Sequence, residues 1–372
     1  MSSQSQPRSR LRDAAVVTVF FCIVTALAAE AVVRVYHAAK NRDIVYVWKA
    51  PSYWFLYADH DAFGWMARPD YRLDWTVSTL EGEPYEVHYT TDARGMRPTT
   101  RHGDRPNLLV VGDSFTQAAQ ANDGETYYNH LGEALGYDVT AYGVGGYGSL
   151  QELMALRYLM ESTKPDLVVW QACANDFMNN DYELERQSRL YNVRRRRPYL
   201  EDGEIVYRKP FSVLQSLVNR VPRTIRFPHT AMGLIQRVSA GRLDVEAEEA
   251  VELARMDSPE FRASVAATKA TFAQAAELLD DTPWVLFNVD AYRTPYQRIY
   301  ERLSGELNIP LVGAGLPTPT QRPDLYAADG LHWSQTGHKV VADHLQAEIT
   351  LLLTQAHADS SDTAATEPAG VR

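Results

Sequence analysis

The chain has 372 residues, of which 45% are hydrophobic and 23% charged, and a formal net charge of −10 at pH 7. This composition suits a globular protein with one large α/β domain or two average domains. The acidic balance argues against a general nucleic-acid-binding protein, which usually carries a basic excess or stripe. The two cysteines, Cys22 and Cys173, predict neither a disulfide framework nor a cysteine metal site.

The N-terminal region contains one long apolar segment. A basic stretch precedes a run from Ala14 to Val33 whose only charged residue is Glu30. As a helix this run is roughly 30 Å long, which is the thickness of a bilayer core. We predict a cytoplasmic N-terminus over 1–13 and an uncleaved signal-anchor over 14–36, so that the main domain is periplasmic or extracellular. A signal peptide cleaved near Ala26-Leu27-Ala28 is the alternative, and it exports the same domain.

Residues 37–106 form a predicted accessory region that is rich in aromatic and turn-forming residues. The alternation in Tyr85-Glu86-Val87-His88-Tyr89 predicts a β-strand. We expect the aromatic residues of the first half to pack onto the main domain, and a membrane interface is the alternative. These residues are Tyr53, Trp54, Phe55, Tyr57, Phe63 and Trp65.

Residues 107–353 alternate short apolar runs with amphipathic segments. This alternation predicts an α/β fold with a doubly wound, five-stranded parallel sheet, covered by helices on both faces, whose ligand site lies at the carboxyl ends of the strands. The predicted strands are Asn107–Val111, Val139–Tyr142, Leu167–Gln171, Trp284–Val289 and Pro310–Gly313. The predicted helices are Glu125–Leu135, Leu150–Glu161, Pro259–Leu279, Pro295–Leu307 and Thr336–Leu353. A disordered tail is expected over 354–372.

An insertion is expected within the main domain at about 182–255. It contains the basic run Arg194 to Arg197, followed by Pro198–Tyr207, which predicts a hairpin with an Asp-Gly turn. We expect the basic run to be a solvated loop. The alternative is a lid that touches anionic glycan or lipid headgroups.

Residues suited to nucleophilic catalysis follow the predicted strands. Ser114 comes directly after the first strand and a Gly-Asp pair, so a tight strand-to-helix turn presents its hydroxyl at the sheet edge. The serine needs a base, and we predict His332 because Asp329, three residues earlier, can orient its imidazole. Gly146 and Asn175 follow the next two strands and add a backbone N–H and a neutral amide donor for an oxyanion. Together these residues predict a serine esterase.

With these motifs the chain resembles the SGNH hydrolase superfamily, the GDSL-type esterases and lipases, whose four blocks contribute Ser, Gly, Asn and His. The resemblance covers residue 107 to about 353. It implies that Ser114 is the nucleophile, that the Ser114 N–H, Gly146 and Asn175 form the oxyanion hole, and that Asp329 orients the base His332. The membrane segment and the stretch from Asp92 to Arg97 are also similar to membrane-anchored bacterial members.

The sequence departs from the family pattern at two blocks. Cys173-Ala174 precede Asn175 where the family usually has Gly-x, and Ala141 stands where the second block usually opens with Asn. The Cys173 side chain is expected to narrow the pocket near the acyl group. This departure bears on the size of the substrate more than on the mechanism.

The resemblance leaves the substrate open, because the family includes lipases, thioesterases, carbohydrate O-acetylesterases and acyltransferases on exported polysaccharides. We expect hydrolysis of carboxylic esters, with O-acetyl groups of glycans among the candidates, through an acyl-enzyme on Ser114. The alternatives are O-acyl transfer to an exported polysaccharide and non-catalytic glycan binding. An ester or acylated glycan and the membrane are the expected partners, and nucleic acid is not.

One motif points to a different class of enzyme. Gly143–Gly148 matches the dinucleotide fingerprint and makes an NAD(P)-binding oxidoreductase a remote alternative. Against it, the acidic residue expected after the next strand is displaced to Asp176. No cofactor is predicted. No metal is predicted either, because the other histidines lack metal-ligand spacing, among them His60, His88, His130 and His338.

Overall fold

The structure is a computed structural model that describes residues 8–39, 56–188, 191–193, 195–209, 217–218, 221, 225–228, 231 and 245–365. The chain divides into two compact units. One comprises Met1–Phe55 and Phe211–Asp244, and the other Leu56–Pro210 and Val245–Arg372. The predictions made for Tyr53, Trp54, Phe55 and Arg194 fall outside the described residues.

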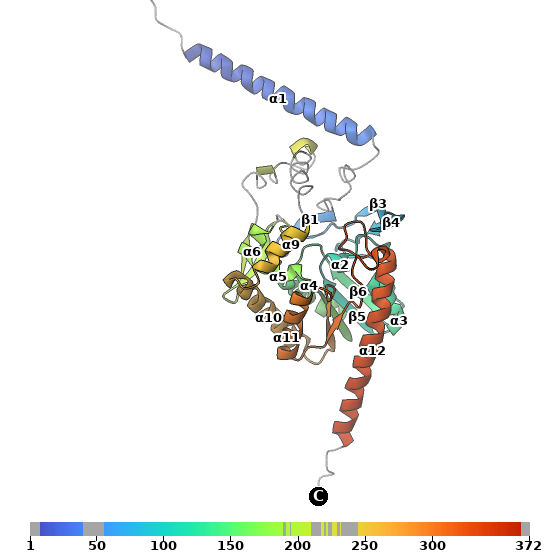
Figure 1. Cartoon of the computed structure of the whole chain (residues 1–372). Coiled ribbons are helices and arrows are strands. Elements are labelled where there is room, and N and C mark those ends of the chain that lie inside the picture. Colours follow the sequence, from blue (N-terminus) through green and yellow to red (C-terminus); the bar gives the residue numbers. More distant parts are fainter. Residues whose placement is uncertain are drawn as a thin grey trace, which may run out of the picture. The chain divides into compact units, whose positions relative to one another are not determined.

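The first unit contains the long helix α1, Arg8–Ala39 (Figure 1). Its segment Asp13–Val35 has a mean hydropathy of 2.4, and none of it is buried. Inside this apolar run the charge of Glu30 is paired, because Arg34 Nε lies 2.7 Å from Glu30 Oε1 one turn further on. By length and composition α1 can cross a membrane, and an N-terminal signal sequence has the same properties.

The second unit is built on a five-stranded parallel sheet with the strand order β11-β10-β7-β5-β6. The strands are β5 (Asn107–Gly112), β6 (Asp138–Gly143), β7 (Leu167–Ala172), β10 (Trp284–Asn288) and β11 (Leu311–Gly313). The chain order reverses at β5, which has β6 on one side and β7 on the other. In doubly wound sheets the crevice at the carboxyl ends of such strands is where ligands bind.

Helices cover both faces of this sheet, as predicted. On one face Leu108 and Val110 of β5 share a buried core with Leu131 of α3 and Leu345 of α12. On the other face the ring centroids of Trp170 and Phe272, from β7 and α10, are 5.3 Å apart. The long helices are α3 (Tyr127–Leu135), α4 (Ser149–Thr163), α10 (Pro259–Leu279), α11 (Thr294–Leu307) and α12 (Gln335–Ala365).

The C-terminal helix is longer than predicted. α12 continues past Leu353 to Ala365, so the expectation of disorder directly after Leu353 is corrected, while residues 366–372 lie outside the described part of the chain. The physical reason is that residues 354–365 contain neither Pro nor Gly, and their alanines and Gln355 favour a helix.

Two antiparallel hairpins form the described part of the predicted accessory region. They are β1 (Tyr57–His60) with β2 (Gly64–Ala67), and β3 (Arg72–Ser78) with β4 (Pro84–Thr90). Tyr57, Phe63 and Trp65 are buried. The Tyr57 hydroxyl donates to Gln117 Oε1 at 3.2 Å, and Trp65 Nε1 donates to the Gly145 carbonyl at 3.2 Å. These aromatic residues therefore pack onto the α/β layers, as predicted.

The insertion contributes the predicted hairpin and several short helices. Strands β8 (Arg197–Glu201) and β9 (Glu204–Arg208) are joined by Asp202 and Gly203, whose φ angles of 52° and 83° are typical of an Asp-Gly turn. The described helices are α6 (Tyr182–Gln187) and α9 (Val245–Ala254). The expectation of a solvated basic run is wrong for Arg197, whose side chain is only 1% exposed because it pairs with buried Glu185.

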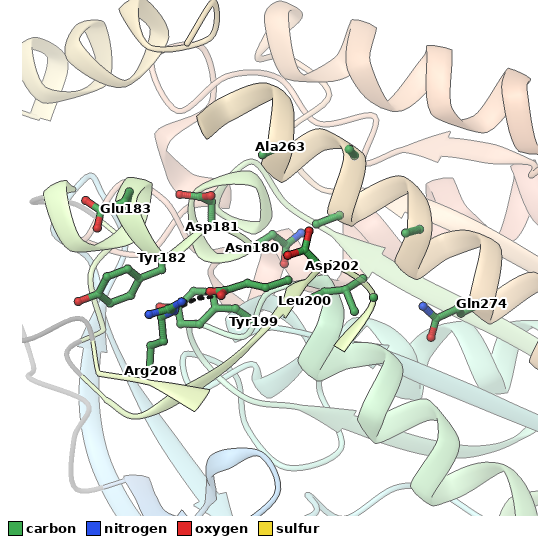
Figure 2. A pocket seen from close by; sticks show the side chains of 15 residues that line it. Asn180, Asp181, Tyr182, Glu183, Tyr199, Leu200, Asp202, Arg208, Ala263 and Gln274 are labelled. Carbon is green, nitrogen blue, oxygen red and sulfur yellow. Dashed lines mark hydrogen bonds and ion pairs between the residues drawn. The ribbon is translucent and has the colours of Figure 1, made fainter. Parts of the chain in front are cut away.

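A hollow of about 700 Å³ lies between α6, the β8–β9 hairpin and α10 (Figure 2). Four alanines of α10 line one side of it, and Tyr182 and Arg208 line another. The charged groups pair within this wall, since Arg208 Nη2 lies 2.6 Å from Glu201 Oε2. None of the predicted site residues lines this hollow.

The stretch from Asp92 to Arg97 supports the short helix α2 (Ser114–Gln117). The buried Arg97 guanidinium donates to the carbonyls of Ala118 and Ala121, the latter at 2.9 Å. It also lies 2.6 Å from Asp123 Oδ1. Arg97 thus holds the turn that ends the helix on which Ser114 stands.

Replacing Arg97 by Met removes the donor of three carbonyls, at Gln117, Ala118 and Ala121, and of one carboxylate. We expect the free energy of unfolding to fall by about 3 kcal/mol, because partly buried acceptors lose their partner. Urea denaturation measures this change. Arg94→Met is the matched control, because Arg94 is 52% exposed and its pair with Asp92 spans 3.5 Å, so that the loss is at most about 1 kcal/mol. Equal losses in both variants would refute the role of Arg97.

Candidate active site

A tight turn between β5 and α2 exposes Ser114. Gly112 ends the strand where there is no space for a side chain, since a Cβ there would lie 2.3 Å from Gln171 Oε1. Asp113 then caps α2, with its Oδ1 accepting from Phe115 N at 3.0 Å. Ser114 is the first helical residue, and the first N–H groups of a helix have no acceptor within it. The turn therefore presents both the hydroxyl and a free N–H of Ser114.

The structure brings the predicted nucleophile, base and orienting carboxylate together. Ser114 Oγ lies 2.8 Å from His332 Nε2, and His332 Nδ1 lies 2.7 Å from Asp329 Oδ2. The other oxygen of Asp329 accepts the N–H groups of Leu331 and His332, each at 3.0 Å. This chain of hydrogen bonds has the geometry of an activated serine.

The loop that carries His332 is tied to the accessory hairpin β3–β4. Thr79, just after β3, forms an isolated bridge with Ala327, and the Ala328 N–H donates to the Ser78 carbonyl at 2.8 Å. On the other side, the Phe115 ring lies 5.1 Å from the imidazole of His332. The imidazole is therefore fixed from the accessory region and from α2 at once.

The pair Asp329–His332 shifts the pKa of both groups. Burial by itself lowers the pKa of the imidazole, but the charge and the hydrogen bond of Asp329 outweigh it and raise the pKa of His332 above its ordinary value. Burial likewise raises the pKa of Asp329, and the charge of His332 reverses this, so that the pKa of the carboxyl is lowered. The arrangement stabilises an imidazolium beside a carboxylate.

The oxyanion donors predicted from the second and third blocks differ in whether they already donate a hydrogen bond. Gly146 has φ of +75°, and a Cβ there would lie 2.4 Å from Val193 Cγ2, so only glycine fits. Its N–H takes part in none of the hydrogen bonds found among the described residues. Asn175 begins the short helix α5 (Asn175–Asn179), and its Nδ2 donates to the Tyr147 carbonyl at 3.3 Å and to Asn179 Oδ1 at 3.1 Å.

The Cys173 thiol donates to a buried carboxylate. Its sulfur lies 3.1 Å from Asp290 Oδ2, which also accepts the Ala174 N–H at 2.9 Å. Burial raises the pKa of this thiol, with the charge of Asp290 adding to the effect. Cys173 therefore stays a protonated hydrogen-bond donor at neutral pH and is not a second nucleophile.

Sequence reasoning missed several residues around this site. Asp113 and Gln171 shape the serine turn, and Trp65 and Arg197 contact the turn that carries Gly146. Asp113 had a local signal, because an acidic residue before a helix is a common N-cap. Trp65 was expected only to pack onto the main domain, and neither its contact with this turn nor that of Arg197 had a local signal, because both contacts span long separations in the sequence. Within the described residues, no group of three His, Cys, Asp or Glu side chains is placed to hold a metal ion.

The structure combines a parallel sheet with a hydrogen-bonded chain of Ser, His and Asp side chains at its carboxyl edge, an arrangement that recurs in hydrolases of the α/β class. The GDSL-like lipase/acylhydrolase family model matches residues 110–340, and the chain belongs to this family. It is a carboxylic ester hydrolase of the SGNH/GDSL type. No curated protein matches the chain.

Solved structures similar to this chain include three esterases or acylhydrolases. Esterase EstA from Pseudoalteromonas sp. is 13% identical, with 67% of this chain and 98% of that chain covered and a TM-score of 0.36. The lipase/acylhydrolase from Enterococcus faecalis is 13% identical, with 66% and 95% covered and a TM-score of 0.35. The acetylxylan esterase Axe2 from Geobacillus stearothermophilus is 14% identical, with 66% and 94% covered and a TM-score of 0.33.

Replacing Asp329 by Asn tests whether the Asp329 carboxylate raises the pKa of His332. In the wild type kcat/KM should fall as the pH drops through the raised pKa of His332. The midpoint of this fall, the acidic limb of the pH profile, should therefore lie above the ordinary histidine pKa of about 6.5. In Asp329→Asn the carboxylate that raises this pKa is gone, so the acidic limb moves to lower pH and kcat falls by about 10⁴-fold. The pH profile of ester hydrolysis measures both effects.

Asp324→Asn is the matched control for that experiment. Asp324 lies five residues earlier and pairs with Arg322 at 2.7 Å on the surface. Its replacement should leave the acidic limb unchanged. An acidic limb that stays in place in Asp329→Asn would show that Asp329 does not set the pKa of His332.

Proposed function

We propose that the protein is a membrane-anchored serine esterase that cleaves carboxylic esters through an acyl-enzyme on Ser114. The observation that carries this proposal is the continuous hydrogen-bond chain from Ser114 Oγ through His332 to Asp329, with distances of 2.8 and 2.7 Å. In this proposal the N–H groups of Ser114 and Gly146, neither of which is hydrogen-bonded among the described residues, receive the developing negative charge.

In the first half of the reaction Ser114 Oγ attacks the ester carbonyl while His332 Nε2 takes its proton. The carbonyl oxygen becomes an oxyanion, which the N–H groups of Ser114 and Gly146 stabilise, and each such donor is worth roughly 3 kcal/mol. The imidazolium then protonates the leaving alcohol, and the C–O bond of the ester breaks. In the second half His332 Nε2 takes a proton from a water whose oxygen attacks the acyl carbon. The bond between Ser114 Oγ and the acyl carbon then breaks, the imidazolium returns the proton to Ser114 Oγ, and the acid leaves.

Asn175 is proposed as the third oxyanion donor. The longer of its two hydrogen bonds, to the Tyr147 carbonyl at 3.3 Å, is the weaker one to give up. One N–H can then turn to the oxyanion while the bond to Asn179 Oδ1 keeps the amide in place. In the absence of substrate, catalytic groups often form hydrogen bonds that differ from those of the reacting complex.

A small acyl group is proposed as the preferred substrate moiety. The side chain of Val193 occupies the space beside Gly146, where a Cβ would lie 2.4 Å from Val193 Cγ2. A short acyl chain such as acetyl needs the least room there, and O-acetyl groups of glycans are one natural source of it.

Ser114→Ala tests the nucleophile. We expect a fluorophosphonate probe to label the wild type covalently and to leave Ser114→Ala unlabelled, with ester turnover reduced by roughly a thousandfold or more. Ser162→Ala is the matched control, because that hydroxyl only donates to the Leu159 carbonyl at the end of α4. Labelling that survives Ser114→Ala would overturn the assignment. Comparing acetylated glycans with longer acyl esters on the same proteins then measures the preference for short acyl groups.

Arginine substitutions in α1 test the membrane anchor. Each arginine at the centre of a spanning helix costs about 2.5–3.5 kcal/mol. The full chain should therefore resist alkaline carbonate extraction, and a Val19→Arg, Val24→Arg double variant should be released. The intact mass should include the N-terminal residues. A mature protein that begins after Ala28 would contradict the uncleaved anchor.

A further inference from the structure

The turn that carries the oxyanion donor Gly146 is held by three different segments of the chain. Its three consecutive carbonyls, at Gly145, Gly146 and Tyr147, each accept a side-chain donor. Trp65 Nε1 donates to the first at 3.2 Å, Arg197 Nη2 to the second at 2.5 Å, and Asn175 Nδ2 to the third at 3.3 Å. Only Asn175 belongs to the motif blocks.

The contact of Trp65 fixes the direction of the Gly146 N–H. The carbonyl of Gly145 and the N–H of Gly146 belong to one planar trans peptide, so they point in opposite directions. Trp65 Nε1 binds that carbonyl from β2, which aims the N–H away from the indole. The Tyr147 hydroxyl donates to the Trp65 carbonyl at 2.6 Å, so that two hydrogen bonds join Trp65 to this turn.

Arg197 fixes the peptide on the other side of Gly146. Its guanidinium binds the Gly146 carbonyl and Gln151 Oε1, each at 2.5 Å, and lies 4.8 Å from the centre of the Trp65 ring. Glu185 holds the guanidinium in place, with Oε2 at 2.6 Å from Nε, and neither side chain is more than 1% exposed. A glycine has no side chain to restrict its rotation, so both of its peptides need outside support.

We propose that Trp65 and Arg197 are positioning residues for the oxyanion hole, which act as one unit to aim the Gly146 N–H at the reacting carbonyl. This inference rests on the proposed function. Both side chains are buried, so their proposed role is exerted through the Gly146 turn. A displacement of about 1 Å in a catalytic group can cost 10²-fold in rate. Replacing either residue should therefore lower kcat and leave substrate binding unchanged.

The test compares Trp65→Phe and Arg197→Lys with the wild type. Trp65→Phe keeps a ring against Arg197 and removes the N–H donor, and the smaller ring also leaves buried space, which the control Trp170→Phe reproduces. Arg197→Lys keeps the charge but cannot reach Gly146 O, Gln151 and Glu185 together. We expect kcat to fall by about 10- to 100-fold in each with KM nearly unchanged, and the rate of fluorophosphonate labelling to fall in parallel. In the double variant the loss should be smaller than the product of the single losses, because both residues act on one N–H.

Two control variants separate this role from general destabilisation. Arg208→Lys alters the cross-strand neighbour of Arg197 in the same hairpin and its ion pair with Glu201. Trp170→Phe removes another buried indole hydrogen bond, from Nε1 to Glu152 Oε2 at 2.6 Å. Both should keep kcat within about twofold of the wild type, with activities normalised to the folded fraction from thermal unfolding.

The outcomes distinguish the inference from the proposed function. A wild type that neither hydrolyses esters nor reacts with the probe contradicts the proposed function itself. An active wild type whose Trp65→Phe and Arg197→Lys variants keep kcat, or lose only thermal stability, overturns the positioning role. A rise in KM at constant kcat also overturns it, because it would mean that these residues bind substrate.

Discussion

The hydrogen bond between Ser114 Oγ and His332 Nε2 joins residues 218 positions apart, and the rest of the second unit is arranged so that it can form. Ser114 is placed by the end of β5, and His332 by the loop that enters α12. These elements meet because β5 lies inside the sheet, between β7 and β6, and α12 packs on α3 across one face of it. Proton transfer requires heavy atoms about 3 Å apart, so small shifts between these elements would break the chain of hydrogen bonds.

Much of this arrangement is readable from local patterns. The five apolar runs predicted the strands to within one or two residues, and Pro259–Leu279 matches its predicted bounds because Ser258 caps the helix and proline follows it. The predicted nucleophile, base and carboxylate also come from short motifs, and the structure brings them together.

The contacts that were missed are tertiary. Trp65 meets Gly145 across 80 positions, and Arg197 meets Gly146 across 51. No periodicity marks either contact. A run of four arginines is typical of a solvated surface, and only the buried carboxylate of Glu185 makes Arg197 a core residue. Such pairing depends on which segments the fold brings side by side, and one sequence does not contain that information in a local form.

The position of Trp65 has a consequence for where the working enzyme begins. The family match starts at residue 110, after both accessory hairpins. A fragment excised at that boundary would retain all four motif blocks but would lack the indole over the glycine turn and the strand that tethers the histidine loop. A fragment of this hydrolase that keeps both contacts must include β1 and β2 and so begins no later than Tyr57, whereas motif-based boundaries would separate these hairpins from the motif blocks.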